Sequence, residues 1–339
     1  MQDLERKIIV ITPIKNEAWI LDEFLSAVSI YADHIIVSDH ASTDNSIRIA
    51  ESFTKATVIK TKFEKFAESE RRDELLTAAR AFGENNLILS IDADEFLTPN
   101  LITPESLGAL KSQPIGTRFH VPLWNVKPGF NRYWTPGLTP IGFVDDGSNH
   151  PGKDAIHFPR IPQKSGAPAL ELSQGGLLHL QFIQWDRMMS KHRWYQVWET
   201  INFPAKSPVE IFRRYDHMNI LPKSAFLDLQ PSHLDNYREM GVDLKSLEDA
   251  ERVFWWDAEV ENLISKHGIQ KFRYLDLKGL TSIAPSRVSL SVLLFRLYLF
   301  VTSPLHKYSY LFPLRLALIV LDKAFGRFFV SGKREFSKD

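Results

Sequence analysis

In the first hundred residues, short apolar runs alternate with segments in which apolar residues recur every three or four positions. The apolar runs have the length of buried strands, whereas the periodic segments predict helices. The expected strands are residues 7–12, 34–38, 57–60 and 87–91, and the expected helices are residues 18–31, 46–53 and 66–82. Strands that alternate with helices indicate a parallel sheet with right-handed crossovers, and therefore an α/β fold.

Polar loops follow three of these expected strands. Ligands bind beyond the carboxyl ends of the strands in open α/β sheets, so the three loops predict a binding edge. The loop after residues 87–91 contains Asp92 and Asp94, one residue apart. Two such carboxylates suit Mg²⁺ or Mn²⁺, which commonly bridge carboxylates to substrate phosphates. The alternative for an isolated Asp-x-Asp is a solvated acidic turn.

Taken together, the three loops resemble the nucleotide-sugar-binding half of the family 2 glycosyltransferases. The matching segments read TPIKNE (12–17), DHASTDNS (39–46) and DADE (92–95). The resemblance covers about residues 7–100. It implies a GT-A fold, which is a Rossmann-like, mostly parallel sheet flanked by helices. The chain departs from the family at His40-Ala41, where a small residue and Gly are frequent, and at Asp73, where relatives tend to have Asn.

The resemblance implies a donor site at this edge. Its expected members are Thr12, Pro13, Asn16, Glu17, Asp39, Ser42, Arg71, Arg72, Asp92, Ala93 and Asp94. Thr12 and Pro13 would line the base pocket, and Asp39 would accept a hydrogen bond from the base or ribose. Arg71 or Arg72 would meet the diphosphate or acidic side chains.

Local alternatives exist for two of these pairs. Asn16 and Glu17 could instead cap the helix at 18–31. Arg71 and Arg72 could belong to a solvated, charged helix face.

The expected metal ligands are Asp92, Asp94 and His179. By resemblance, Asp94 is the main ligand of Mn²⁺ or Mg²⁺ across the donor diphosphate, with Asp92 near the ribose or the metal. His179 lies in a short apolar segment after Gly175-Gly176. GT-A enzymes often bring a late histidine back to the metal, and imidazole is an acceptable ligand of Mn²⁺. The alternative is a histidine whose hydrogen bonds are satisfied in the core.

Residues 116–205 are expected to form the acceptor half of the domain. A helix at 104–111 and a strand at 116–124 precede residues 125–168, which are rich in Gly, Pro and Asn and predict long loops. Aromatic residues there could stack on sugars or pack the core. Inverting transfer needs a base for the acceptor hydroxyl. The candidates are Asp145, Asp146 and Asp154, of which Asp146 and then Asp154 are preferred, and His150 and His157 are weaker.

The last third, residues 206–339, predicts a helical extension. An amphipathic helix is expected at 247–266, and large apolar runs follow at 288–301 and 310–321. Both runs are shorter than the roughly 20 residues of a membrane span. Residues 286–334 contain eight Lys or Arg against one acid, Asp322. This combination predicts helices on an anionic bilayer surface. The alternative is a hairpin that packs on the catalytic domain or on a second copy.

Composition narrows the class of protein. With 339 residues, 44% hydrophobic and 24% charged, the chain is expected to be folded. Lys plus Arg and Asp plus Glu both number 41, which argues against a nucleic-acid partner. The absence of Cys excludes disulfides and thiolate chemistry. The charged start leads directly into a strand, so we expect no signal peptide and a cytoplasmic location, peripheral on the inner face of the cytoplasmic membrane if the basic helices bind it.

Together these features predict a metal-dependent, inverting glycosyltransferase. It would move a sugar from a nucleotide-diphosphate donor, with UDP favoured by the family, to a glycan or lipid-linked acceptor in envelope or polysaccharide synthesis. Residues 1–115 would bind the donor, 116–205 the acceptor and metal, and 206–339 would form the extension.

Two other functions stay open. A sugar-phosphate nucleotidyltransferase should carry a Gly-rich phosphate loop after the first strand, but residues 12–17 contain no Gly. A non-catalytic glycan-binding scaffold would not need the pair Asp92 and Asp94.

Overall fold

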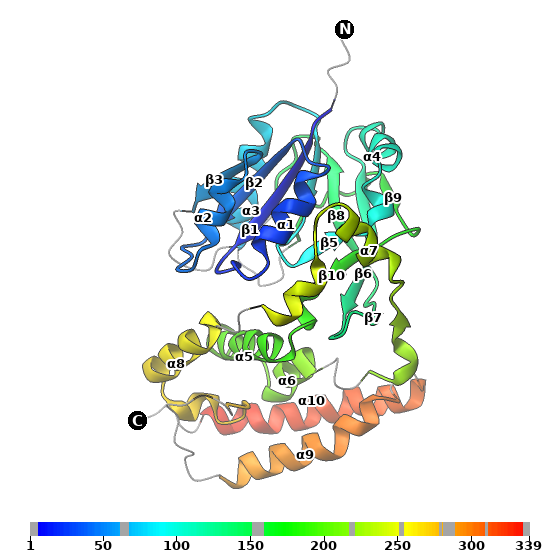
Figure 1. Ribbon diagram of the computed structural model, residues 1–339. Helices are drawn as coiled ribbons and strands as arrows, with labels where there is room; N and C mark the ends of the chain where they lie inside the picture. Colours follow the sequence, from blue (N-terminus) through cyan, green and yellow to red (C-terminus); the bar gives the residue numbers. More distant parts are fainter. Residues whose placement is uncertain are drawn as a thin grey trace. The chain divides into compact units, whose positions relative to one another are not determined.

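The computed structural model describes residues 6–61, 68–150, 159–216, 221–250, 254–277, 280, 289–308 and 311–334. The chain divides into two compact units, residues 1–183 with 227–251 and residues 184–226 with 252–339. Figure 1 labels the elements of both units. The functional division predicted at 115/116 and 205/206 stays a prediction.

A parallel sheet forms the first part of the first unit. It has the strand order β3-β2-β1-β4, and all neighbours are parallel. The strands are β1 (Ile8–Ile14), β2 (His34–Asp39), β3 (Ala56–Lys60) and β4 (Leu87–Ser90). The helices between them are α1 (Leu21–Ser29), α2 (Ser46–Ser52) and α3 (Glu68–Arg80). The predicted α/β fold is therefore confirmed.

Both faces of this parallel sheet are covered. Val10 in β1 packs into a core that includes Phe24 of α1, whereas Ile9 and Ile11 pack with Leu75 of α3. A strand buried on both sides needs apolar residues at consecutive positions, not at alternate ones. This explains why the strands of the sequence read as unbroken apolar runs.

Antiparallel strands extend the sheet beyond β4. The order continues β8-β6-β7-β11, with β8 (Leu138–Val144) antiparallel to β4. The other strands are β5 (Glu95–Leu97), β6 (Arg118–Val126), β7 (Arg132–Trp134), β9 (Ala169–Glu171), β10 (Leu177–His179) and β11 (Leu227–Asp228). Helices α4 (Pro104–Lys111) and α7 (Ser232–Glu239) complete the unit.

The prediction of long loops over residues 125–168 is wrong for β7 and β8. Gly142 lies inside β8 and has a packing role there, not a role in a loop. A Cβ on Gly142 would lie 2.4 Å from the carbonyl oxygen of Ile88, so only glycine lets β8 approach β4 this closely. Three aromatic side chains of the region pack in the core, since Phe130, Trp134 and Phe143 are buried.

The second unit is helical. Its helices are α5 (Trp185–Asn202), α6 (Pro208–Asp216), α8 (Trp255–His267), α9 (Leu290–His306) and α10 (Phe312–Arg334). The helix predicted from residue 247 begins only at Trp255. Among the residues that the structure describes, no helix combines the length and apolar character needed to cross a bilayer.

Candidate functional site

The site forms where β1, β2 and β4 end. In the pairing of β1 with β2, Ile14 is opposite Asp39, the last residue of β2. Asp39 is 1% exposed, and its carboxylate accepts a hydrogen bond from the backbone N–H of Ser42 at 3.2 Å. Asp92 and Asp94 follow β4 at the same edge of the parallel strands. The structure therefore brings the three predicted loops together.

The first two loops are joined by hydrogen bonds. The backbone N–H of Asn16 donates to Ser42 Oγ at 2.8 Å, and that of Glu17 donates to Ser46 Oγ at 2.8 Å. In return, Asn16 Oδ1 accepts from the backbone N–H of Thr43 at 2.6 Å. Helix α1 starts after Ile20 without a side-chain cap. Asn16 therefore links the two loops and does not cap the helix.

The departure from the family at His40-Ala41 leaves the loop backbone in a glycine-like conformation. Ala41 has φ 51°, in the left-handed region that glycine favours. At the end of β1, Thr12 is fully buried, and its Oγ1 has no hydrogen-bond partner among the described residues. Pro13 is partly exposed. A contact of either residue with a nucleobase stays a prediction.

Both candidate arginines of α3 are buried, so the solvated-face alternative is wrong for them. Arg72 is 4% exposed and donates to Ser90 Oγ at 2.9 Å and to Asp92 Oδ1 at 3.2 Å. Arg71 Nη1 lies 3.1 Å from His40 Nδ1. Burial and the charge of Arg71 lower the pKa of His40 to about 4. His40 is therefore neutral at pH 7 and able to accept a hydrogen bond from Arg71.

The buried side chain of Glu95 bonds to the turn that carries Asp92 and Asp94. Glu95 Oε2 accepts from the backbone N–H of Asp92 at 3.1 Å. Glu95 Oε1 also accepts from Arg160 Nη2 at 2.8 Å, and Arg160 lies 3.9 Å from Asp92 Oδ2. The sequence prediction missed Arg160, because no local pattern signals a partner 65 residues from Glu95. Asp92 is thus flanked by two guanidinium groups, those of Arg72 and Arg160.

Strand pairing brings His179 to the same turn. In β10, His179 is opposite Glu95 of β5 and opposite Asn125 of β6. His179 Nε2 lies 3.7 Å from Asp94 Oδ2. On the other side of the ring, His179 Nδ1 lies 2.7 Å from Asn125 Oδ1. The structure therefore brings His179 beside Asp94, and the role of His179 as a metal ligand stays a prediction.

The contact with Asn125 determines what His179 presents to Asp94. When the Nδ1–H of the neutral ring donates to Asn125 Oδ1, Nε2 carries a lone pair directed toward the Asp94 carboxylate. Two electron-pair donors then face one another, and a cation between them would bind to both. Asn125 is 4% exposed, so water competes little for this hydrogen bond.

The residues present fit a divalent ion held by few protein ligands. Within the described ranges, no group of three or more His, Asp or Glu residues is placed to hold a metal. Asp94 and His179 are arranged as a pair, whereas Asp92 already contacts Arg72. Mg²⁺ is typically bound by one or two carboxylates together with substrate phosphates and water. Asp94 with His179 therefore fits an ion that completes its coordination on a diphosphate.

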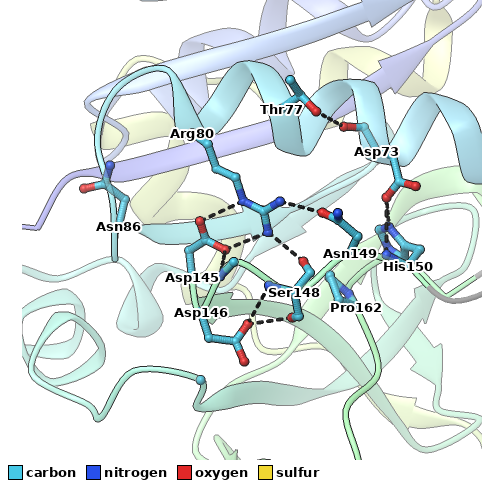
Figure 2. Close-up of polar contacts among 12 residues, drawn as sticks. Asp73, Thr77, Arg80, Asn86, Asp145, Asp146, Ser148, Asn149, His150 and Pro162 are labelled. Carbon is cyan, nitrogen blue, oxygen red and sulfur yellow. Dashed lines mark hydrogen bonds and ion pairs between the residues drawn. The ribbon is translucent and has the colours of Figure 1, made fainter.

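The structure does not bring Asp145 and Asp146 to this site. In the antiparallel pairing of β8 with β4, Val144 is opposite Leu87, so residues after β8 lie at the amino end of β4. Both Asp145 oxygens accept from Arg80, each at 2.9 Å (Figure 2). Asp145 is therefore half of a buried ion pair at the opposite edge of the sheet.

Asp146 is held by three residues in the same region. It accepts from Ser148 Oγ, from Lys164 Nζ at 3.2 Å and from Arg118 Nη2 at 3.4 Å. Burial raises the pKa of Asp146, but the hydrogen bonds from Ser148 and Lys164 and the charge of Arg118 lower it to about 2. A carboxylate this acidic is a weak general base at neutral pH.

Of the other base candidates, the structure describes His150, which contacts helix α3 at the residue after Arg72. His150 Nδ1 lies 2.9 Å from Asp73 Oδ1, which gives a partner to the residue where relatives tend to have Asn (Figure 2). Asp154 and His157 lie outside the described residues.

Comparison with known proteins gives one match of family type. Residues 9–110 match the family model described as glycosyl transferase family 2. Among solved structures, the chain is similar to glucosyl-3-phosphoglycerate synthase from Mycobacterium tuberculosis in complex with phosphoglyceric acid. The identity is 22% over 35% of this chain and 44% of that chain, with a TM-score of 0.25.

Two further structures are similar at lower identity. One is a 4-diphosphocytidyl-2C-methyl-D-erythritol synthase, with 17% identity, 42% of this chain and 76% of that chain covered, and a TM-score of 0.27. The other is HddC from Yersinia pseudotuberculosis, with 11% identity, coverage of 52% and 94%, and a TM-score of 0.31. Likenesses with TM-scores this low support no conclusion about ligands or activity.

Proposed function

We propose, from the match of residues 9–110 to the glycosyl transferase family 2 model, that the chain transfers a sugar from a nucleotide-diphosphate donor with the help of a divalent cation. The observation that carries the proposal is the pair Asp94 and His179. Their facing atoms are 3.7 Å apart at the edge of the sheet where Asp39 and Asp92 also lie. Sugar transfer from such a donor needs a site of this kind, because the leaving diphosphate carries the developing charge.

The donor side of the site has distinct tasks. Asp39 is suited to accept a hydrogen bond from the base or ribose, while Thr12 and Pro13 are expected to line the base pocket. Ser42 and Asn16 hold the loop around Asp39 in shape. Arg71 is expected to orient His40, and Arg72 is expected to orient Asp92. The positive charge of Arg160 offsets the negative charge of the acids in the turn.

Asp94 and His179 would hold Mn²⁺ or Mg²⁺, with Asp92 nearby. A bound divalent ion acts as a Lewis acid that stabilises the charge on the departing diphosphate. Asn125 orients the His179 ring for this task. Ala93, which stands between the two acids, is buried.

The acceptor is expected to be a hydroxyl of a glycan or of a lipid-linked sugar, attacked with inversion after a base removes its proton. Asp146 is not favoured as this base because of its place and its pKa. Asp154 stays a prediction. UDP is the favoured nucleotide. If the acceptor is lipid-linked, the chain would act at the cytoplasmic face of a membrane.

The test is donor turnover over a panel of nucleotide sugars with Mn²⁺, comparing the wild type with Asp94→Asn. The substitution keeps the shape of the side chain and removes its charge. We expect kcat/KM to fall by about a thousandfold, which is about 4 kcal/mol of transition-state stabilisation. Asp228→Asn is the matched control, because Asp228 is an exposed acid of the same unit whose ion pair among the described residues is with Arg132.

Normal turnover by Asp94→Asn would reject the metal assignment. Release of pyrophosphate from a nucleoside triphosphate and a sugar 1-phosphate would instead identify a nucleotidyltransferase. If no nucleoside diphosphate with Mn²⁺ raises the melting temperature of the wild type, the scaffold alternative is favoured, since a ligand stabilises only the protein that binds it.

A further inference from the structure

Helix α9 exposes an apolar stripe along its whole length. The exposed members are Leu290, Leu293, Leu294, Leu297, Phe300 and Val301. Their spacing of three and four residues places them on one face of the helix. Val292, Phe295, Tyr298 and Thr302 lie on the other face and are buried in the second unit. Leu290 is 72% exposed and Phe300 78%, so the stripe faces away from the core of its unit.

Helix α10 lies beside α9 and has the same character (Figure 1). The rings of Tyr298 in α9 and Phe325 in α10 stack with centroids 4.3 Å apart. Phe312 is 73% exposed, and Leu316 and Val320 follow at intervals of four residues. Exposed apolar side chains are ordinary when scattered, but contiguous apolar faces of this extent mark interaction sites.

The charges of the two helices have one sign at the surface. Lys323 and Arg327 continue the row of Leu316 and Val320 on α10 and are exposed. Arg296, Lys307 and Arg315 add three further exposed cations.

The one acid of residues 289–334 points inward. Asp322 is 19% exposed in its side chain and accepts a hydrogen bond from the Tyr298 hydroxyl at 2.6 Å. It also lies 3.4 Å from Arg213 and 3.3 Å from His306. No exposed carboxylate therefore offsets the cations within the described part of the two helices.

We propose that the exposed face of α9 and α10 is a docking surface for an anionic lipid bilayer. The helices would lie in the plane of the interface, with the leucines and phenylalanines in the acyl boundary and the cations at the phosphates. A second copy of the chain fits less well, because a two-fold interface would oppose the exposed cations of α9 and α10, and the described residues of these helices include no exposed acid. The proposal stands independently of the proposed sugar transfer.

The experiment is flotation of the full chain with vesicles of phosphatidylcholine, with and without phosphatidylglycerol. We expect binding only when phosphatidylglycerol is present, and release by high salt. Phe300→Ser and Phe312→Ser should each weaken binding about tenfold or more, because each ring leaves water on docking. Lys323→Ser and Arg327→Ser should each weaken it about fivefold.

Matched controls come from exposed residues outside the two helices. Ile115→Ser changes an apolar side chain that is 51% exposed, and Lys223→Ser and Lys245→Ser remove exposed cations. We expect vesicle binding of all three to equal that of the wild type. The substituted side chains are at the surface, and circular dichroism with melting temperatures checks that each variant folds.

Three results would overturn the proposal. The first is that the chain binds equally well to vesicles of pure phosphatidylcholine. The second is that Phe300→Ser and Phe312→Ser bind vesicles as the wild type does. The third is that the wild type forms a dimer without vesicle affinity and these two substitutions dissociate the dimer. Donor hydrolysis in solution is measured on the same variants and should not change. Loss of vesicle binding is thereby separable from failure of the sugar-transfer proposal.

Discussion

If Asp94 and His179 hold a divalent ion as proposed, loss of the hydrogen bond between Asn125 and His179 should weaken the affinity for that ion. Asn125→Leu keeps a buried side chain of similar size on β6 but removes the oxygen that lies 2.7 Å from His179 Nδ1. The ring then loses the partner that selects its tautomer and its orientation toward Asp94. Changes of such supporting residues typically weaken metal affinity 10- to 100-fold. This corresponds to about 1.4 to 2.8 kcal/mol.

The effect is measurable as thermal stability. A metal present at about 100 times its Kd stabilises the wild type by about 2.7 kcal/mol. If Asn125→Leu raises the Kd about 30-fold, the same concentration stabilises the variant by only about 0.9 kcal/mol. Melting is followed with and without Mn²⁺ in the presence of a nucleoside diphosphate, and Mn²⁺ is also titrated against donor turnover. We expect the Mn²⁺-induced rise in Tm to shrink to about one third.

Asn86→Leu is the matched control for this prediction. Asn86 is a buried asparagine of the same unit at the opposite edge of the sheet, where its Oδ1 accepts from the backbone N–H of Lys7 at 2.9 Å. Its substitution should lower the Tm without metal and leave the Mn²⁺-induced rise intact. A rise in Asn125→Leu equal to that of the wild type would refute the reasoning. Equal losses in both variants would mean that the effect is general destabilisation.

Two further predictions concern titratable groups. The folded-state pKa of Asp146 is lowered to about 2, so its stabilisation is present above pH 4 and is lost as the pH falls toward 2. Asp146→Asn should therefore lower the free energy of unfolding at pH 7 by about 2 kcal/mol and leave the rate of sugar transfer within about threefold of the wild type. Loss of transfer with unchanged stability would support Asp146 as the base. His40 has its pKa lowered to about 4, so the unfolded chain takes up this proton first and stability falls as the pH drops below 6.5. Urea unfolding should show a loss between pH 7 and pH 5 that is about 2 kcal/mol smaller in His40→Gln than in the wild type, and an equal loss in both proteins would contradict the lowered pKa.

The sequence predicted the first four strands well because burial on both sheet faces leaves a local trace. Val10 is buried on one face of the sheet, and Ile9 and Ile11 are buried on the other. A strand with both faces buried has apolar residues at consecutive positions, and this run can be read from the sequence. The loops that follow such strands gather at one edge, so Asp39, Asp92 and Asp94 could be grouped before the structure was known. This part of the site rests on chain order alone.

Other parts depend on pairings that chain order does not determine. The sequence favours Asp146 as the base because it lies within the predicted acceptor half, but β8 runs antiparallel to β4 and carries Asp146 to the far edge of the sheet. His179 came from family resemblance, and its contact with Asp94 depends on β10 lying between β5 and β6. Arg160 had no signal, since its role arises only from the buried Glu95 that it meets.

The hydrogen bonds that join the loops of Asn16 and Ser42 have a consequence for donor affinity. Because these loops are tied to one another through side chains, their conformational freedom is lost when the chain folds and not when the nucleotide arrives. A nucleoside that binds there, as we propose, would meet loops that are already ordered. Asn16 and Ser46, which tie the two loops together, thereby become determinants of how tightly the proposed donor binds.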